Sequence, residues 1–513
     1  MAHSFRPIEC IARSRRPAPS GRQALLWLLA MLCLLGFAFQ GTRPLWESDE
    51  GRYTAVALQM LDSGDFLVPR LNDHHEHYTK PPLTYWIIAA SVAAFGRNAW
   101  AVRLPYALAF VLTGLLVYAL GRHFVPERPW LPALLWGSSL LAVLAANVVS
   151  TDGFLVLFET LAVLAWLRSR EAARPLRWQL LMGLAFGLAF LTKGPPGLLP
   201  LLPMAVWTLA VEGRQGLRHL FPPAALPVFA VTGLGWFVWI VVQRPVLLGY
   251  FLGYELFDRV FTPVHDRNAQ WYGAAKVYLP VLFLAVFPWG LVDLGWLRTL
   301  RMAWRPSAWR RWLAEDRDRA FLLLWTLLPL CVFFVARSRL FLYVLPLAVP
   351  ISLLLARRFA PSIAPAREPF WRIALPVWVL LVLLVKAAST QIPSHKDARA
   401  EAERLLAGVR PPDRILFVGM PAHYGLRLYA GVPVEQVDRR PTPGAAGFDP
   451  REELCRDLRA HPDALLVVSS TPGAPDPQRA CPDIALAEHS PGIWQPVPAG
   501  AATTGIALPA VGH

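Results

Sequence analysis

Charged residues are scarce in this chain of 513 residues. They make up 17% of the sequence, against about a quarter in soluble domains, while hydrophobic residues make up 55%. This balance excludes an ordinary soluble domain and indicates a membrane protein. The net charge of +15 does not indicate a nucleic-acid partner, because the arginines fall in short clusters between apolar runs. That pattern is typical of loops that lie beside anionic lipid.

Several catalytic motifs are missing as well. The chain has no GxxxxGK[ST] loop, no GxSxG and no HExxH, so nothing indicates nucleotide use, a serine hydrolase or a zincin. Cysteines number only 5, and no CxxC pair occurs. Cys455 and Cys481 lie beyond the last apolar run. They form a disulfide if that region is extracytoplasmic, or stay as two free thiols.

What the chain does have is a series of apolar runs close to the length that a membrane-spanning helix needs. They lie at about 24–41, 101–121, 130–149, 153–168, 178–192, 196–211, 222–243, 275–297, 320–336, 340–356 and 372–389. About 11 crossings place the arginine-rich segments on one side, which the positive-inside rule makes cytoplasmic. We therefore predict an all-α polytopic membrane protein with a cytoplasmic amino terminus. Its first run is expected to be a retained helix and not a cleaved signal peptide.

The longest outer loop, residues 42–100, concentrates ionisable residues. Within it, Glu50–Leu61 has a helical pattern and residues 83–96 are apolar but short, so both are expected to form helices at the membrane interface. We predict a transmembrane domain over residues 1–389. Residues 390–513 are predicted to form a small outer α/β domain, with short strands separated by a helix at Pro450–Ala460.

The outer loop offers three candidate sites. Asp49 and Glu50 suit the deprotonation of a nucleophile near the bilayer, but they also suit the start of a helix. Lys80, before two prolines, suits a phosphate at headgroup depth or simple contact with lipid headgroups. A run of histidines and acids resembles either a divalent-metal cluster or a solvated turn, so the metal stays unknown. Its members are Asp73, His74, His75, Glu76 and His77.

Other ionisable side chains are expected on the same outer side, at the ends of apolar runs. Their concentration there, opposite loops rich in arginine alone, suggests a shared cavity for an anionic substrate. They are Asp152, Lys193, Arg259, His265, Asp266, Arg267, Arg337, Arg339 and Tyr343.

Longer motifs carry a family resemblance. DEGRYTAVALQMLDSGDFLVPRLN, HYTKPPLTYW and FGRNAWAVRLP are followed by STDGFLVLF, FLTKGPPGLLP, YELFDRVF, WYGAAKVYLPVLFLAVFPWG and SRLFLYVLPL. Together, over roughly residues 40–360, they resemble the bacterial aminoarabinose transferases of the protein O-mannosyltransferase-like group. The resemblance implies a GT-C glycosyltransferase in the inner membrane. Such an enzyme moves a sugar from a polyprenyl-phosphate donor, typically undecaprenyl phosphate, to an acceptor on the periplasmic face.

The resemblance also implies roles for individual residues. Asp49 takes the position at the reaction centre, and inversion at the anomeric carbon is the expected outcome. Lys80 takes the position that contacts the lipid phosphate, assisted by Arg259 or Arg267 and by Tyr343. The cavity lining is expected to include Glu50, Arg52, Tyr53, Asp152, Lys193, Arg337 and Arg339.

One departure from the family pattern concerns specificity. The family usually reads F-E-K-P, whereas this chain reads Tyr78-Thr79-Lys80-Pro81 and so lacks a carboxylate at Thr79. The expected acceptor is lipid A, with a protein or another envelope glycan as the alternative. A polyprenol-linked sugar transporter is an alternative of a different class. No cofactor is required by the sequence, although a divalent metal is possible.

Overall fold

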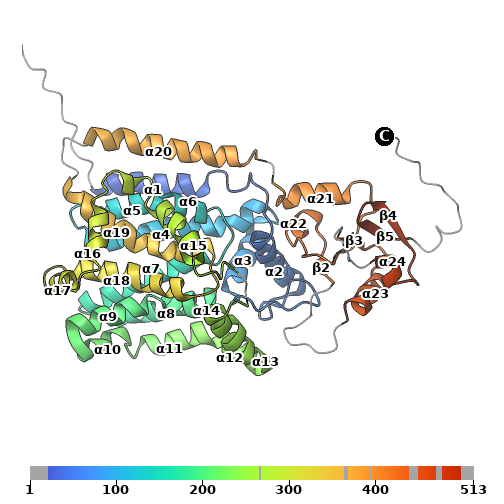
Figure 1. The fold of residues 1–513 in the computed structure, drawn as a ribbon, viewed down its shortest axis with the longest axis horizontal. Coiled ribbons are helices and arrows are strands. Elements are labelled where there is room, and N and C mark those ends of the chain that lie inside the picture. The colour runs from blue at the N-terminus through green and yellow to red at the C-terminus, as the bar shows by residue number, and fades with distance from the viewer. Residues whose placement is uncertain are drawn as a thin grey trace, which may run out of the picture.

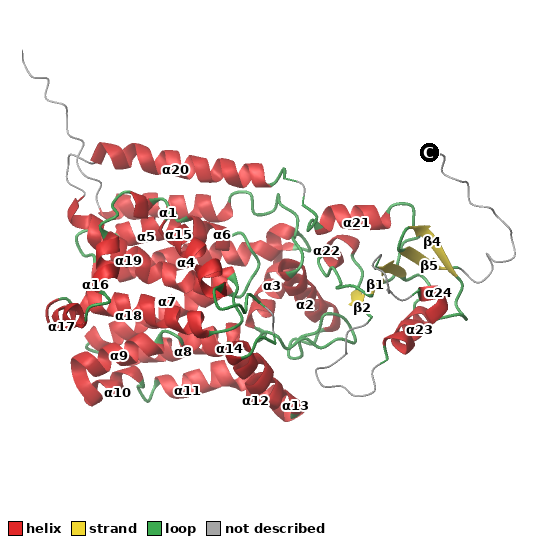
Figure 2. Cartoon of the chain, in the orientation of Figure 1, coloured by secondary structure: helices red, strands yellow, loops and turns green. Residues whose placement is uncertain are grey.

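The computed structural model is mostly helical, with a small sheet towards the carboxyl end (Figures 1 and 2). It describes residues 21–264, 267–362, 368–392, 394–437, 449–469 and 476–497. Long helices lie side by side in a bundle, and two shorter helices, α2 (Asp49–Ser63) and α3 (Leu83–Phe95), lie at one end of it (Figure 1). The sheet lies beyond that same end.

The bundle is built from apolar segments that the sequence marks as membrane helices. Its longer members are α1 (Gly21–Phe37), α4 (Ala99–Phe124), α7 (Asp152–Glu171), α8 (Leu176–Lys193), α9 (Leu201–Glu212), α15 (Gly273–Val286), α17 (Pro306–Glu315), α18 (Arg317–Val335), α19 (Ala348–Phe359) and α20 (Glu368–Ser389). Shorter pieces are α5 (Trp130–Gly137), α6 (Leu140–Ala145), η1 (Pro195–Leu198), η2 (Gly213–Gly216), α10 (Leu217–Leu220), α11 (Ala225–Phe229), η3 (Ala230–Leu234), α12 (Gly235–Gln243), η5 (Trp289–Leu291), α16 (Trp296–Met302), η6 (Phe341–Leu347) and η7 (Ala360–Ser362).

Five helical stretches are long and apolar enough to cross a membrane: Ala99–Phe124, Pro195–Leu220, Ala225–Gln243, Arg317–Val335 and Phe341–Phe359. Further apolar helices are shorter. The chain is therefore a multi-pass membrane protein. Each predicted run overlaps at least one helix, but the number of 11 crossings stays a prediction.

Two predicted spans differ from the structure. The run at 130–149 is two helices, because the Ser139 side chain accepts the Ala142 N–H and starts α6. At the break, the Ser138 carbonyl accepts the Trp378 indole N–H at 2.7 Å. The run at 275–297 also ends early, at Val286, because Pro288 cannot continue the helix.

The segment between α12 and α15 is helical over much of its length. It holds a nearly continuous helical stretch made of α13 (Val246–Gly249), η4 (Tyr250–Asp258) and α14 (Arg259–Phe261). Because η4 is a π-helix, its turn is wider than that of an α-helix. This stretch places Glu255 and Arg259 one turn apart.

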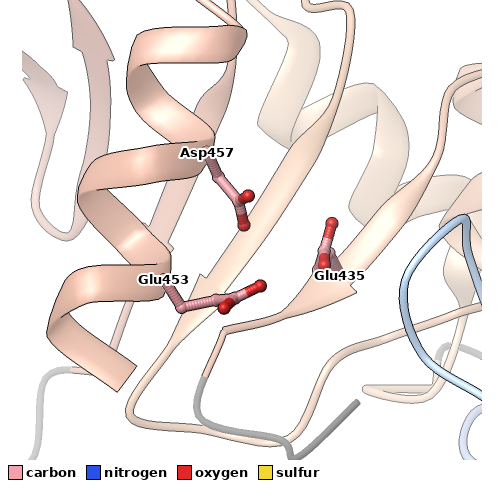
Figure 3. A group of neighbouring side chains, drawn as sticks. All are labelled: Glu435, Glu453 and Asp457. Atoms are coloured by element: carbon pink, nitrogen blue, oxygen red, sulfur yellow. The ribbon is translucent and has the colours of Figure 1, made fainter. Parts of the chain in front are cut away.

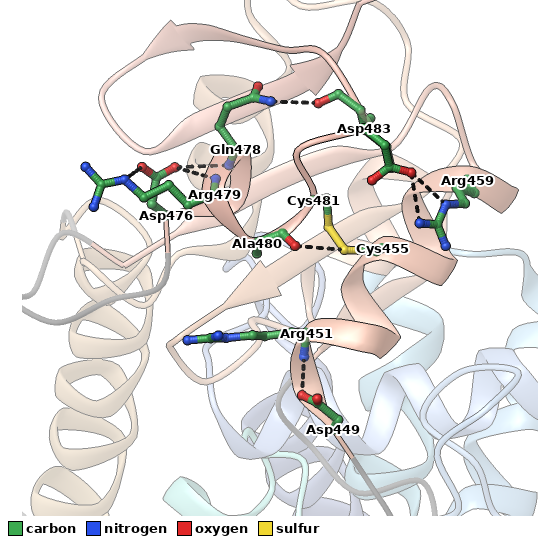
Figure 4. Close-up of a disulfide and its surroundings, with 11 residues drawn as sticks. Asp449, Arg451, Cys455, Arg459, Asp476, Gln478, Arg479, Ala480, Cys481 and Asp483 are labelled. Atoms are coloured by element: carbon green, nitrogen blue, oxygen red, sulfur yellow. Dashed lines mark hydrogen bonds and ion pairs between the residues drawn. A yellow bond between two sulfur atoms is a disulfide. The ribbon is translucent and has the colours of Figure 1, made fainter.

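The C-terminal unit, meaning described residues 394–497, contains a five-stranded sheet in the order β2-β1-β3-β5-β4. Strands β1 (Ile415–Val418), β2 (Val434–Gln436) and β3 (Leu465–Val468) are parallel, whereas β4 (Leu486–Ser490) and β5 (Ile493–Pro496) are antiparallel to their neighbours. Its helices are α21 (Ala398–Leu406), α22 (Leu426–Ala430), α23 (Pro450–Ala460) and α24 (Pro477–Ala480). The predicted helix at Pro450–Ala460 is confirmed. A disulfide joins Cys455 of α23 to Cys481, just after α24 (Figure 4).

The two faces of this sheet pack against different partners. Ile415 and Phe417 of β1 share a core with α2 and α3, while Leu416 and Val418 point the other way, toward α23. This alternation follows from the two-residue period of a strand. The C-terminal unit is therefore packed directly on the first loop, behind the helix that carries Asp49.

Candidate active site

Asp49 opens helix α2, where the positive end of the helix dipole favours an acid. Its carboxylate pairs with Arg52 one turn later, and 53% of its side chain remains exposed. Both residues and Tyr53 line a polar cavity of about 130 Å³. The predicted helix start and an exposed carboxylate at the cavity therefore occur together at Asp49.

The polar cavity is bounded by residues from distant parts of the chain. Predicted residues in its wall are Asp49, Arg52, Tyr53, Lys80, Asp152, Lys193, Arg259, Arg267 and Tyr343. The structure thus brings together residues that the sequence placed in separate outer segments.

A second, larger cavity of about 590 Å³ adjoins the polar one. Its wall is mainly apolar, with Phe190, Phe237 and Phe251 among its residues. Several of the polar cavity's wall residues are also in its wall, among them Lys80, Lys193, Glu255, Arg259 and Tyr343. An apolar chamber therefore ends at a group of cations, which is the shape expected for a lipid with an anionic head.

Lys80 lies where these two cavities meet. Its ammonium donates to the Thr79 carbonyl at 2.8 Å. Burial, followed by the positive charges of Arg259, Lys193 and Arg267, lowers the pKa of Lys80 to about 7. A lysine among cations is short of negative charge, so an anion placed between them would be held strongly.

Two acid–base pairs flank Lys80. Lys193 at the end of α8 pairs with Asp152 at the start of α7, and its ammonium lies 4.0 Å from the centre of the Tyr343 ring. Arg259 pairs with Glu255 and donates to the Tyr343 hydroxyl at 3.4 Å. Tyr343 therefore contacts both basic residues and fixes their spacing.

Glu50 lies apart from the cavities, although it neighbours Asp49 in sequence. It is buried and pairs with Arg43 and Arg103, each at 2.8 Å. Burial alone would raise the pKa of Glu50, but these two guanidinium groups lower it to about 2. Glu50 also accepts the Val149 N–H at 3.1 Å. It therefore fixes the first turn of α2 against the bundle. Glu50 was expected to face the cavity, but it does not.

Arg337 and Arg339 are also outside the cavity walls. Arg337 donates to the Ala269 carbonyl at 3.3 Å, and Arg339 donates to the Asn268 and Gln270 carbonyls at 2.7 and 2.8 Å. They brace the segment after Arg267. Two other predicted residues of this segment, His265 and Asp266, lie outside the described residues.

The histidine run does not assemble into a group of metal ligands within the described parts of the chain. His75 is buried and contacts Asn72 and Glu435, at 3.0 and 3.1 Å. His77 contacts the Thr79 hydroxyl at 2.8 Å. His75 thus connects the first loop to the C-terminal unit, whereas His77 makes its contact within the loop. Both are buried, so the solvated turn is wrong for these two residues.

Some contributors were missed at the sequence level. Glu255 had a readable signal, because it stands four residues before Arg259 in a helical pattern. Arg103, the buried partner of Glu50, lies 53 residues away in the sequence, and no local pattern relates the two. Glu47 is a third case, since its carboxylate accepts the Gly425 N–H from the C-terminal unit.

Comparison with known proteins identifies relatives of this chain. Residues 79–239 match the family model for dolichyl-phosphate-mannose-protein mannosyltransferase. An undecaprenyl phosphate-alpha-4-amino-4-deoxy-L-arabinose arabinosyl transferase of Pectobacterium carotovorum is 31% identical over 432 residues, which are 79% of this chain and 70% of that protein. The chain belongs to the family of these aminoarabinose transferases.

Other members of the family are matched over a shorter part of their length. The transferase 2 of Sodalis glossinidius is 33% identical over 342 residues, covering 65% of this chain and 58% of that protein. Three such relatives are each matched over 58 to 60% of their own length.

The fold agrees with this assignment. The crystal structure of ArnT from Cupriavidus metallidurans bound to undecaprenyl phosphate superposes with a TM-score of 0.67 at 18% identity. The match covers 93% of this chain and 98% of that one. The fold is therefore the ArnT-like GT-C fold that the sequence motifs implied.

Proposed function

We propose that this protein is a membrane glycosyltransferase that uses a sugar linked to undecaprenyl phosphate. Support comes from the junction of its two cavities, where an apolar chamber of about 590 Å³ meets Lys80, Lys193 and Arg259. The prenyl chain would occupy the chamber and the phosphate would lie among the cations. The names of the relatives support the same donor class.

The charges at the junction suit the chemistry of this transfer. The acceptor oxygen attacks the anomeric carbon, and the bond from that carbon to the phosphate oxygen breaks. The lipid phosphate keeps the electron pair, so negative charge grows beside Lys80, Arg259 and Arg267, which stabilise it. Asp49 takes the proton from the acceptor hydroxyl. Attack opposite the departing phosphate inverts the anomeric carbon.

The other cavity residues position the reactants. Arg52 holds Asp49, and Tyr343 spaces Lys193 and Arg259. Asp152 keeps Lys193 at the cavity wall. We assign no cofactor to the reaction centre, because fixed cations of the chain supply the positive charge; activity after treatment with a chelator tests this assignment.

The membrane orientation is part of the proposal. The reaction would take place on the periplasmic face of the inner membrane, with the arginine-rich loops in the cytoplasm. The disulfide between Cys455 and Cys481 supports an oxidising compartment for the C-terminal unit. Alkylation of single engineered cysteines with a membrane-impermeant reagent tests the side of each loop.

Aminoarabinose and lipid A are the first substrates to test, because they follow from the family. Thr79 gives the cavity no carboxylate, and its hydroxyl is engaged with His77. The acids in the wall, Asp49, Asp152 and Glu255, are each paired with a base. A neutral sugar, passed to a protein or another envelope glycan, therefore merits a parallel test.

Mass spectrometry of the cell envelope provides the deciding experiment. A deletion strain is compared with strains that carry the wild type or Asp49→Asn, and lipid A, glycoproteins and polyprenyl-phosphate sugars are all profiled. We expect one acceptor to lose its sugar in the deletion strain, to regain it only with the wild type, and the donor to accumulate. Unchanged acceptors, together with a donor redistributed across the membrane, would instead support a transporter.

A further inference from the structure

Three buried carboxylates converge in the C-terminal unit, away from the candidate active site (Figure 3). Glu453 and Asp457 lie one turn apart on α23, and Glu435 faces them from β2. One oxygen from each carboxylate lies within 4.8 Å of the other two. Glu453 is 6% exposed, Asp457 is 3% exposed and Glu435 is 0% exposed. Within the described parts of the chain, this is the one group of His, Cys, Asp and Glu side chains with such spacing.

The protein neutralises this group incompletely. Glu435 pairs with Arg414 at 2.6 Å and with His75 at 3.1 Å, and Glu453 pairs with Arg456. Asp457 has a more distant cation, since the Arg456 Nη2 lies 3.9 Å from its Oδ1.

The second oxygen of Asp457 is an independent observation that points to a ligand. Its Oδ2 atom is buried and has no hydrogen-bond partner among the described residues. The side chain is directed into the space between α23 and β2, toward Glu435 (Figure 3). A buried carboxylate oxygen without a partner is strongly unfavourable, unless a cation or a donor binds it.

We propose that Glu435, Glu453 and Asp457 bind a hard divalent cation of the Ca²⁺ class that fastens α23 to the edge strand β2. Carboxylate oxygens are the ligands that such ions prefer. The spacing also fits, because oxygens on opposite sides of Ca²⁺ lie at about twice ~2.4 Å, close to the 4.8 Å limit found here. Three carboxylates supply up to six oxygens, and water completes the shell.

Arg456 is the cation of the chain that would compete with a bound ion at this cluster. Its guanidinium contacts Glu453 and lies near Asp457, yet 59% of its side chain is exposed. It therefore supplies part of the positive charge that the cation would supply, and it can leave toward solvent when the cation binds. Arg414, the partner of Glu435, is buried and cannot turn toward solvent in the same way.

The consequence of binding reaches the first loop. Glu435 contacts His75, and the carbonyl of Val434, its neighbour on β2, accepts from the Asn72 side chain at 3.4 Å. A cation that fixes β2 would therefore stabilise the contact between the C-terminal unit and the loop that carries Asp49. The site is structural, and its readout is binding and stability, independent of sugar transfer.

Calorimetric titration of the full-length protein in detergent, stripped with a chelator, tests the proposal directly. We expect CaCl₂ to bind at one site, with MgCl₂ weaker, and millimolar CaCl₂ to raise the unfolding temperature by several degrees. Asp457→Asn should weaken Ca²⁺ binding at least tenfold. Asp463→Asn is the matched control, because this acid is 52% exposed in the same unit and should leave binding unchanged.

Wild-type protein that binds no Ca²⁺ in the millimolar range, or an Asp457→Asn variant that binds it equally well, would overturn the proposal. Arg456→Gln provides a second decision if Asp457→Asn fails to fold. Removal of the competing guanidinium should tighten Ca²⁺ binding severalfold. Unchanged or weaker binding in Arg456→Gln would also overturn the proposal, because an ion held by Glu453 and Asp457 must compete with this guanidinium.

Discussion

The first loop presents two different surfaces. One carries the residues that we propose take part in the reaction, and the other carries residues that hold the loop in place. One surface faces the polar cavity, where Asp49 is 53% exposed and Lys80 is surrounded by other cations. The other surface faces the bundle and the C-terminal unit, where Glu50 and His75 are buried and paired. Charges of the same kind, close together in sequence, therefore have opposite tasks. Exposure to the cavity, and not charge alone, distinguishes the residues that we propose take part in the reaction.

The sharpest test of this contrast replaces the exposed acid. Asp49→Asn should reduce sugar transfer by about 10²- to 10⁴-fold, the usual contribution of a general base. Its unfolding temperature should stay close to the wild-type value, because Asp49 is paired with Arg52 at the surface. Transfer in nanodiscs and thermal unfolding would be measured on the same preparation. Residual activity near that of the wild type would remove Asp49 from the reaction.

The adjacent acid should show the opposite result. Glu50→Gln leaves Arg43 and Arg103 without their carboxylate, which costs about 3–5 kcal/mol for a buried pair. We expect little folded protein in the membrane and a lower unfolding temperature for the remaining fraction. Size-exclusion profiles and thermal unfolding in detergent provide the measurement. A stable but inactive Glu50→Gln variant would contradict the division between the two surfaces.

Lys80 should have a smaller effect that depends on pH. Its pKa of about 7 means that it carries full charge below that pH and loses it above. The wild type should therefore bind undecaprenyl phosphate roughly tenfold more tightly than Lys80→Met at about pH 6, as for one charge-assisted contact, and should lose this advantage at about pH 8.5. Lys80→Met should bind weakly at both values. Equal pH dependence in Lys80→Met and wild type would assign the titration to the lipid phosphate or to another group.

A further test concerns Glu47, at the contact between the first loop and the C-terminal unit. Burial raises the pKa of Glu47 to about 7, so the folded state holds a proton that the unfolded state has released above about pH 4.5. Stability should consequently fall as pH rises from about 4.5 to 7, by about 1–3 kcal/mol, and level off above. Glu47→Gln should remove this loss, while the exposed Glu403→Gln should keep it. Unfolding at about pH 5 and about pH 8 measures both, and identical pH profiles would contradict the assignment.

Much of the fold was readable because its signals are local. Apolar runs marked the helices, and the helix at Pro450–Ala460 was predicted to the residue, since proline starts it and acids fill its first turn. The cavity residues Lys80, Lys193 and Arg259 were readable because family motifs carry them. Where a run contained a competing local bond, as at Ser139, the prediction of one unbroken helix was wrong.

The remainder depends on contacts between distant segments. The sequence predicted Glu50 in the cavity lining and did not single out Arg103, because only the fold brings the two together. The same holds for His75, whose partner Glu435 lies in a distant part of the chain. Neither periodicity nor spacing contains this information, so the histidine run was open to a metal or a solvated turn.

The junction between the two cavities also bears on the release of the spent lipid. The donor that we propose is a phosphate diester with one negative charge, whereas the spent lipid would be a monoester that approaches two charges near neutral pH. The cations Lys80, Arg259 and Arg267 would thus hold the product more tightly than the substrate. Product departure would then limit turnover, and the rate in the cell would depend on how quickly other enzymes remove spent carrier from the membrane. The cations that favour cleavage of the bond between sugar and phosphate would therefore also make the enzyme sensitive to inhibition by its own product.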